Sequence, residues 1–249
     1  SPTDEGGVLP LGSKIEVREV YIDSGGGAAN AAVTFARQGF SVACIAATGG
    51  DCEGNEIVAQ LEAEGVKTLF QESENKTGFS FILISQNGER SILTFRGSSE
   101  DLKSDILPWH IMQAEWFYLS SLVGNQELMN AIFSFADENK VAIAFNPGSR
   151  ELCLGLKGLK LFLQRLNVLI INKEEASALT DFKEEKAIFK SLAQIKPGLI
   201  IVITKGPEGV SVSDGKTLWR AGTFPEKARV DRTGAGDAFG SGFLAGFIR

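Results

Sequence analysis

The chain has 249 residues, of which 43% are hydrophobic and 22% charged, with 25 basic and 31 acidic side chains and a formal charge of −6. This composition supports a substantial core and excludes a disordered chain or a fibrous repeat. The acidic balance argues against a protein that coats nucleic acid, and no apolar run approaches the roughly 18 residues of a membrane span.

The first part of the chain alternates helix and strand signals. Residues 24–39 begin with glycines and small side chains, continue with an apolar helical pattern and stop at Gly39, which predicts a helix. The apolar run 41–47 predicts a buried strand. A second helical pattern extends from about 55 to 64 and ends at Gly65.

A different pattern follows in residues 78–96. Two strand-like apolar segments in this range flank Asn87-Gly88, the strongest hairpin signal in the sequence. The earlier segment 14–22 alternates polar and apolar residues, which is typical of a half-exposed strand. We therefore expect the strands at 14–22 and 78–96 to form a small sheet separate from the main one.

From Trp116 onward the alternation of strands and helices resumes. Strands are predicted at 116–120, 141–145, 168–171 and 199–204, and helices at about 125–139, 157–166, 173–179 and 183–194. Two short strands near 209–213 and 216–220 predict a hairpin at Asp214-Gly215. Strands joined by helical crossovers form a parallel sheet between two helix layers. We expect a single α/β domain over 1–249, a three-layer α/β/α sandwich with a mainly parallel central sheet and a small β appendage.

Cysteine and histidine usage limits the chemistry. The three cysteines, Cys44, Cys52 and Cys153, are scattered and odd in number, so they predict neither a disulfide framework nor a zinc cluster. The single histidine, His110, cannot supply a multi-histidine metal site. Because the start of the chain also lacks the pattern of a signal peptide, we expect a reduced, cytoplasmic protein.

The most informative stretch is the one from Val230 to Phe239. Gly234 and Gly236 bracket Ala235 and lead into an apolar helical run. Small residues let the N–H groups of a helix start approach an anion, and the helix dipole adds a positive field there. Asp237 in the first turn is either a helix cap or a general base aimed at a hydroxyl beside a bound phosphate. The spacing alone leaves both interpretations open.

Two other stretches also allow a purely structural interpretation. The glycines at 25–27 can form a turn before a small-residue helix; they match the G-x-G-x-x-G dinucleotide fingerprint poorly, which argues against redox chemistry. Asn172 and Glu175 fit a capping box, with Asn172 as N-cap and Glu175 at the third position. The same pair can also contribute to a metal site.

Four stretches, taken in order, resemble signatures of the ribokinase-like (PfkB-type) carbohydrate and nucleoside kinases. They are Gly25 to Ala32 for the first glycine signature, Asn172 to Glu175 for the N-x-x-E motif, Thr204 to Gly209 for the T-x-G-x-x-G nucleotide loop, and Asp231 to Asp237 for the D-T-G-A-G-D signature. The departure is small, since Arg232 stands where Thr is common. The four together span most of the chain.

The resemblance implies ATP-dependent phosphoryl transfer to a hydroxymethyl group of a sugar-like acceptor. Asp237 would take the proton of the acceptor, and the amides of Gly234, Ala235 and Gly236 would form the anion hole. Asp231 matches the family position associated with a monovalent cation, and the sequence leaves open whether K⁺ is used.

The other motifs receive binding roles from the same resemblance. Gly25 and Gly26 would let the backbone touch the sugar, and Asn30 would recognise its hydroxyls. Asn172 and Glu175 would help hold Mg²⁺ through water around the nucleotide phosphates. The nucleotide loop would contribute Thr204, Gly206 and Gly209.

The strands at 14–22 and 78–96 fall where the family places its lid, whose closure excludes water. Arg96, at the end of the last lid strand, either meets an acceptor phosphate or carboxylate or is a solvated strand end. An exposed apolar lid face that includes Phe79 and Phe81 suggests pairing across a two-fold axis into a homodimer.

Family members usually begin with a buried strand before the glycine signature and continue with helices beyond the last motif. Neither is found before Lys14 or after Arg249, so we expect the chain to be incomplete at both ends. The acceptor remains open among sugars, sugar acids and nucleosides. The alternatives are a nucleoside kinase of the same fold and a non-catalytic sugar- or nucleotide-binding regulatory protein.

Overall fold

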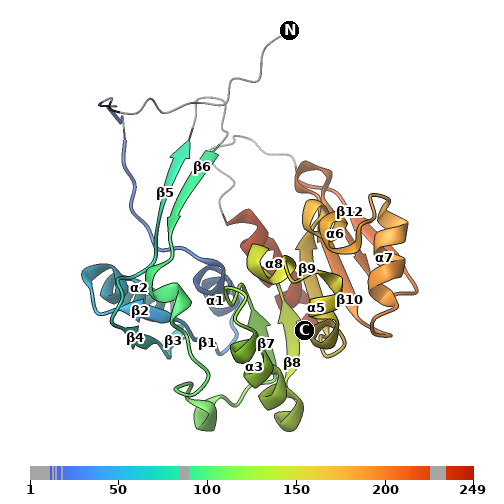
Figure 1. Ribbon diagram of the computed structural model, residues 1–249, viewed down its shortest axis with the longest axis horizontal. Coiled ribbons are helices and arrows are strands. Elements are labelled where there is room, and N and C mark those ends of the chain that lie inside the picture. Colours follow the sequence, from blue (N-terminus) through green and yellow to red (C-terminus); the bar gives the residue numbers. More distant parts are fainter. Residues whose placement is uncertain (1–11, 13, 15, 18, 85–89, 225–233) are drawn as a thin grey trace.

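The computed structural model describes residues 12, 14, 16, 17, 19–84, 90–224 and 234–249 (Figure 1). Its main sheet has six strands in the order β12-β11-β10-β9-β8-β7. These strands are β7 (Trp116–Leu119), β8 (Ala142–Phe145), β9 (Val168–Asn172), β10 (Ile200–Thr204), β11 (Val210–Ser213) and β12 (Leu218–Ala221). The four from β7 to β10 are parallel, whereas β11 and β12 are antiparallel. The expected mainly parallel α/β sheet is confirmed.

Two helix layers cover this sheet (Figure 1). One layer contains α3 (Gln126–Asn139), α4 (Ser149–Leu152), α5 (Gly155–Leu163), α6 (Lys173–Thr180) and α7 (Glu185–Ala193). The other contains α1 (Gly27–Arg37) and α8 (Ala235–Ile248), which pack side by side. Strand β9 separates the layers: Leu169 and Ile171 join the cluster formed with α3, α5, α6 and α7, whereas Val168 and Ile170 join the cluster formed with α1 and α8.

The pattern of α3 illustrates how sequence sets these layers. Its N-cap is Asn125, whose side chain accepts a hydrogen bond from the Leu128 N–H at 3.0 Å. Its buried face includes Phe133, which is fully buried. Because burial of one large apolar side chain contributes about 1.5–3 kcal/mol, the tertiary contacts of this face stabilise α3 more than its cap does.

The segment between α1 and the hairpin contains short parallel pairs. The strand expected at 41–47 is divided into β1 (Ala43–Cys44) and β2 (Ala47–Gly49). They pair with β3 (Lys67–Thr68) and β4 (Gln71–Ser73), and α2 (Cys52–Ala63) lies between them in sequence. Leu61 of α2 packs with Cys44 and Val66 in a separate small core.

The predicted hairpin at 78–96 is confirmed as β5 (Phe79–Ile84) and β6 (Arg90–Phe95), paired antiparallel from Phe79↔Phe95 to Ile84↔Arg90. It projects away from the main sheet (Figure 1). The expected turn at Asn87-Gly88 lies outside the described residues. Asp51 anchors the base of the hairpin, since its carboxylate accepts a hydrogen bond from the Thr77 N–H at 2.8 Å.

The strand expected at 14–22 is wrong for the residues described there. Positions 14, 16, 17 and 19–22 adopt no strand, and Val17, Val20 and Ile22 are more than 70% exposed. Alternating polarity produces a strand only where a neighbouring strand shares its backbone hydrogen bonds. In the described structure β5 and β6 pair with each other, and the sheet that the two of them form has no third strand.

None of the described helices combines the length and the apolar character that crossing a bilayer requires. The most apolar, α8, has 14 residues, whereas a span needs about 20.

Candidate active site

The carboxyl ends of the parallel strands bring several motifs to one edge of the sheet. Thr204 and Asn172 are paired in the register of β10 and β9, so the nucleotide-loop motif and the N-x-x-E motif are neighbours. Asn146, which directly follows β8, donates a side-chain hydrogen bond to the Ile170 carbonyl of β9 at 2.8 Å. In open α/β sheets, ligands bind outside this edge.

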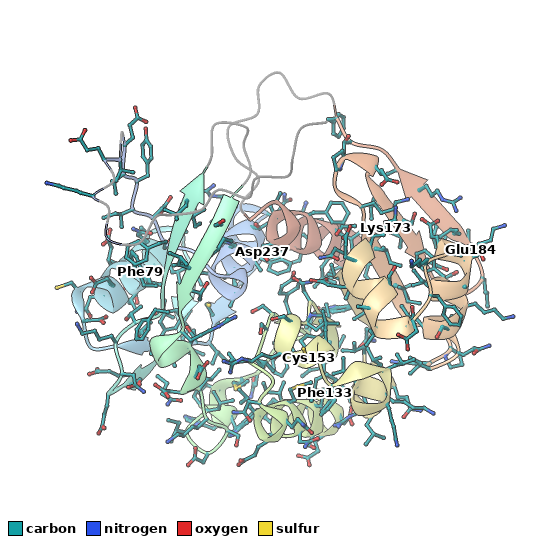
Figure 2. All side chains as sticks on the ribbon, turned by 45° about the horizontal axis from the view of Figure 1, so that its top comes forward. Phe79, Phe133, Cys153, Lys173, Glu184 and Asp237 are labelled. Carbon is teal, nitrogen blue, oxygen red and sulfur yellow. The ribbon has the colours of Figure 1, made fainter. Side chains whose placement is uncertain are left out.

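Two helix N-termini meet next to this edge. The Asn30 Nδ2 of α1 donates a hydrogen bond to the Asp237 Oδ2 of α8 at 2.9 Å, across 207 residues of sequence. Figure 2 labels Asp237, which lies close to α1. A Cβ atom placed on Gly27 would lie 3.1 Å from the Ser120 Cβ and 3.4 Å from the Asp237 Oδ1. The first glycine motif, the end of β7 and the Asp237 motif therefore converge.

The start of α8 is open and lacks a side-chain cap. Gly234 has a φ of +75° and occupies the N-cap position without a side-chain hydrogen bond. The first intrahelical bond runs from the Ala238 N–H to the Gly234 carbonyl, at 2.9 Å. The N–H groups of Ala235, Gly236 and Asp237 therefore precede the helical hydrogen-bond ladder, and a helix start of this kind attracts anions.

The glycines before α1 have space around them. Gly26 is the N-cap, with a φ of +98°, a conformation that favours glycine. A Cβ atom at Gly25 or Gly26 would meet no atom within 4 Å. The backbone of this turn is therefore accessible to a ligand.

Asn172 and Glu175 form the capping box. The Asn172 Oδ1 accepts from the Glu175 N–H and the Glu175 Oε2 accepts from the Asn172 N–H, both at 2.8 Å. Burial raises the pKa of the partly buried Glu175 carboxyl, while the Asn172 N–H opposes that rise. The predicted capping box is therefore confirmed, and it places the carboxyl group of Glu175 at this edge of the sheet.

The loop Thr204 to Gly209 is held by its backbone. Gly206 and Gly209 have φ values of +54° and +86°, and the Lys205 N–H donates to the Gly209 carbonyl at 2.8 Å. A side chain at Gly209 would collide with the Ala221 carbonyl oxygen of β12. The loop can therefore approach a phosphate with backbone groups alone.

A partly buried ion pair holds the same loop. The Lys205 Nζ lies 3.0 Å from the Glu185 Oε2 and donates to the Ser211 Oγ at 2.8 Å. Arg220 donates to the other oxygen of Glu185, at 2.6 Å for Nη2. The loop is thereby fixed to α7 and to the β11–β12 hairpin.

Two expected site residues have no described contact with the residues of this convergence. Arg96 follows β6 at the base of the hairpin and is exposed, and its carbonyl accepts from the Ser99 N–H at 3.0 Å. Asp231 lies outside the described residues.

Sequence reasoning missed a buried carboxylate at the same edge. Glu151 is 0% exposed. Its Oε1 accepts from the N–H groups of Leu122 and Gly124 at 2.8 and 2.6 Å. Its Oε2 accepts from the Gly148 N–H at 2.8 Å and the Ser121 hydroxyl at 3.1 Å. The loop after β7, which carries Ser120, is therefore fixed by one side chain that no sequence motif marks.

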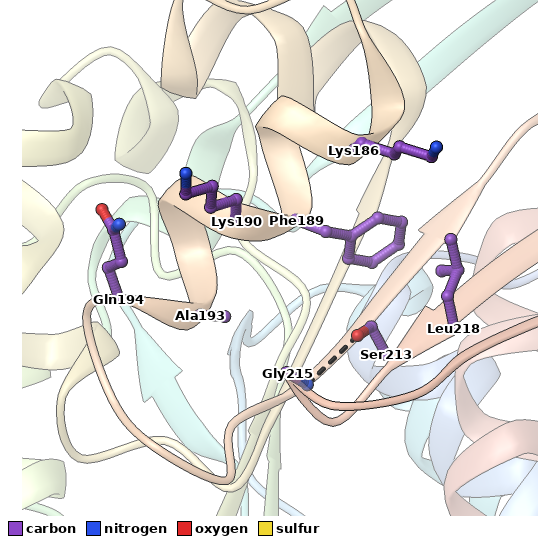
Figure 3. A pocket seen from close by; sticks show the side chains of 8 residues that line it. All are labelled: Lys186, Phe189, Lys190, Ala193, Gln194, Ser213, Gly215 and Leu218. Carbon is purple, nitrogen blue, oxygen red and sulfur yellow. Dashed lines mark hydrogen bonds between the residues drawn. The ribbon is translucent and has the colours of Figure 1, made fainter.

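Two cavities of the described structure differ in their position relative to this arrangement. One of about 650 Å³ adjoins the Asn30–Asp237 contact, and its lining includes Asn30, Thr34, Arg37, Gly234 and Ala235. The other, of about 420 Å³, lies between α7 and the β11–β12 hairpin, with Phe189 and Leu218 in its wall (Figure 3). Ser213 in that wall pairs with Ile201 near the start of β10, so this second cavity is at the opposite edge of the sheet.

The described residues contain no cluster of three or more His, Cys, Asp or Glu side chains that could hold a metal ion by themselves. A metal with few protein ligands and several waters, as Mg²⁺ prefers, is compatible with that finding.

Comparison with known proteins identifies relatives over nearly the whole chain. The family model described as "pfkB family carbohydrate kinase" matches residues 4–249. An "Uncharacterized sugar kinase" of Archaeoglobus fulgidus is 28% identical, with 86% of this chain and 85% of the relative covered. A "Cytidine kinase" of Thermococcus kodakarensis is 27% identical, with coverages of 90% and 80%. A solved Escherichia coli structure, described as a ribokinase II in complex with ATP and Mg²⁺, shares the fold with a TM-score of 0.81 at 18% identity, with coverages of 96% and 81%.

Proposed function

Because the chain belongs to the pfkB family of carbohydrate kinases, we propose that it transfers a phosphoryl group from ATP to a hydroxymethyl group of a sugar or sugar-like small molecule. The observation that carries the proposal is the convergence of the Asp237 carboxylate, Asn30 and the open start of α8. A carboxylate and an anion-binding helix start are the two groups that such a transfer requires.

Asp237 is the proposed general base. As the acceptor hydroxyl oxygen forms its bond to the γ-phosphorus, the hydroxyl proton passes to the Asp237 carboxylate and the bond from phosphorus to the ADP oxygen breaks. The amide of Asn30 holds one carboxylate oxygen at 2.9 Å and leaves the other facing Gly27, which Ser120 also adjoins. The acceptor would bind there, beside the accessible turn at Gly25 and Gly26.

The proposed anion hole consists of the backbone amides of Gly234, Ala235 and Gly236. Charge that develops on the transferring phosphoryl oxygens would face these donors and the positive end of the α8 dipole. Both glycines support this role. The space next to Gly236 is open, since a Cβ atom there would meet no atom within 4 Å, and Gly234 adopts a conformation that favours glycine.

The residues at the ends of β9 and β10 fit a nucleotide with Mg²⁺. Gly206 and Gly209 form a cradle that a Cβ atom at position 209 would disrupt, and Thr204 stands at its entrance. Asn172 and Glu175 would hold Mg²⁺ through water, which agrees with the preference of this ion for few carboxylates. Bound Mg²⁺ neutralises charge on the phosphates. A K⁺ site at Asp231 remains part of the proposal.

The β5–β6 hairpin is the proposed lid. Its exposed apolar face, which includes Phe81 at 61% and Phe95 at 55% exposure, would cover the acceptor or pair with a second copy in a homodimer. Arg96 at its base would meet an acidic group on the acceptor. The three cysteines are free thiols, which favours a reducing compartment such as the cytoplasm.

The alternative acceptor is a nucleoside, because one relative is a cytidine kinase. An ADP-release assay with ATP and Mg²⁺ against sugars, sugar acids and nucleosides distinguishes the possibilities, with acceptor-free ATP hydrolysis as the control. We expect acceptor-dependent ADP release with one class. ATP binding without acceptor-dependent turnover across the panel would favour the non-catalytic binding protein.

A further inference from the structure

Tyr118 of β7 carries a buried hydroxyl that the proposed mechanism does not use. Its ring packs edge-to-face on Phe35 of α1, with centroids 5.5 Å apart. Its Oη is inaccessible to solvent and has no hydrogen-bond partner among the described residues. Burying a hydroxyl without a partner is unfavourable, so natural cores rarely keep one unless it has a role.

The hydroxyl lies against the first turns of α8. A Cβ atom at Gly240 would be 2.8 Å from the Tyr118 Oη, so the absence of a side chain there makes room for it. Asp237 precedes Gly240 by three residues and therefore lies on the same face of α8. Burial, and after it the negative charge of Asp237, raises the pKa of the Tyr118 phenol far above its usual value. The phenol therefore keeps its proton at any physiological pH and remains able to donate a hydrogen bond.

Tyr118 is a titratable side chain that the main sheet places near Asp237. From α1 come the neutral amide of Asn30 and, farther along the helix, Arg37, which is paired with Glu64. Asp23 lines the adjoining cavity. The neighbouring residue of β9 at Gly240 is the apolar Ile170.

We propose that Tyr118 is a positioning residue for Asp237: its hydroxyl, which is unpaired among the described residues, donates a hydrogen bond to the Asp237 carboxylate once a small shift of α8 over β7 brings the two groups together. Asn30 and Tyr118 would then hold the carboxylate from two sides. The catalytic consequence rests on the proposed function, whereas the coupling between the two side chains does not.

Tyr118→Phe tests the catalytic consequence. Because the variant removes a donor to the ionised carboxylate, the acid limb of the kcat/KM profile should move up by about one pH unit. At the plateau kcat/KM should fall roughly tenfold, with the KM for ATP unchanged. The fold should remain intact, since phenylalanine keeps the ring and removes an unpaired hydroxyl. Tyr21→Phe is the control, because Tyr21 is 85% exposed. A profile for Tyr118→Phe that coincides with the control would overturn the proposal.

A measurement that does not depend on kinase activity tests the coupling between Tyr118 and Asp237 separately from the proposed function. The chain has two tyrosines, so a Tyr21→Phe background with fluorinated tyrosine, which ionises at lower pH, reports Tyr118 alone. Asp237→Asn should lower the pKa of that phenol, since it removes the negative charge. An unchanged phenol pKa contradicts the coupling, whatever the kinase assay shows. A lowered pKa in a chain that phosphorylates no acceptor upholds the coupling and contradicts the proposed function.

Discussion

Replacing Glu151 by glutamine tests how the loop after β7 is held. The carboxylate accepts four hydrogen bonds, two at each oxygen, and is fully buried. In Glu151→Gln the amide oxygen can retain the Leu122 and Gly124 N–H groups. The amide NH₂ then faces the Ser121 hydroxyl and the Gly148 N–H. The hydroxyl can rotate and accept a hydrogen bond from the amide, whereas the Gly148 N–H is only a donor and loses its acceptor.

The magnitude follows from that one orphaned donor and the lost charge. A buried N–H without an acceptor costs about 1–3 kcal/mol, and the remaining bonds lose the extra strength that an ionised acceptor gives them. We therefore expect urea unfolding to show a loss of about 2–4 kcal/mol with an unchanged dependence on denaturant. Since Ser120 belongs to the same loop, the KM of the acceptor should rise more than the KM of ATP.

Glu100→Gln is the matched control, because Glu100 makes an exposed ion pair with Arg150 at 2.7 Å. Such surface pairs contribute about 0–1 kcal/mol. If the two glutamine variants unfold at the same urea concentration, the carboxylate of Glu151 does not anchor the loop.

Three further substitutions address the other parts of the site. In Gly27→Ala the added methyl, 3.1 Å from the Ser120 Cβ, should raise the acceptor KM about tenfold in steady-state assays; an unchanged KM would place the acceptor elsewhere. Gly209→Ala should cost more stability and ATP affinity than Gly215→Ala in melting and ATP-titration experiments. The two glycines share a φ of +86°, whose strain costs about 1–2 kcal/mol, but only the first substitution produces a collision; equal effects would contradict this account. Glu175 has a raised pKa in the folded state, so ionising it lowers stability as pH rises between its unfolded and folded pKa values. Glu175→Gln keeps the cap acceptor and should therefore melt no lower than the parent at pH 7 yet require more Mg²⁺ for activity; lower melting with normal Mg²⁺ dependence would leave only the capping role.

Much of the main sheet could be predicted because crossover helices and buried apolar strands constrain each other. The run at 168–171 predicts a strand, and β9 is one, buried on both faces. The segment 14–22 shows the limit. Its alternation is that of a strand, but a strand also needs a partner, and no local pattern supplies one.

The sequence motifs predict which segments form the candidate site, but they do not predict the contacts between their side chains. Asn30 and Asp237 belong to separate motifs, and only the packing of α1 on α8 brings the Asn30 Nδ2 within 2.9 Å of the Asp237 Oδ2. Tyr118 stands in an apolar run where an aromatic residue indicates core, and most of its ring is core. Glu151 occupies the third position of a short helix, where a glutamate usually indicates a surface cap. Their roles depend on tertiary neighbours that spacing does not encode.

Asp237→Asn tests the central claim most directly, with ATP binding measured by calorimetry and phosphoryl transfer measured under single-turnover conditions. Asp181→Asn is the control, since Asp181 ends α6 with a φ of +60°, which asparagine tolerates. The account predicts that ATP binding persists while the transfer rate falls about 10²–10⁴-fold. A transfer rate equal to that of the control would contradict Asp237 as the base.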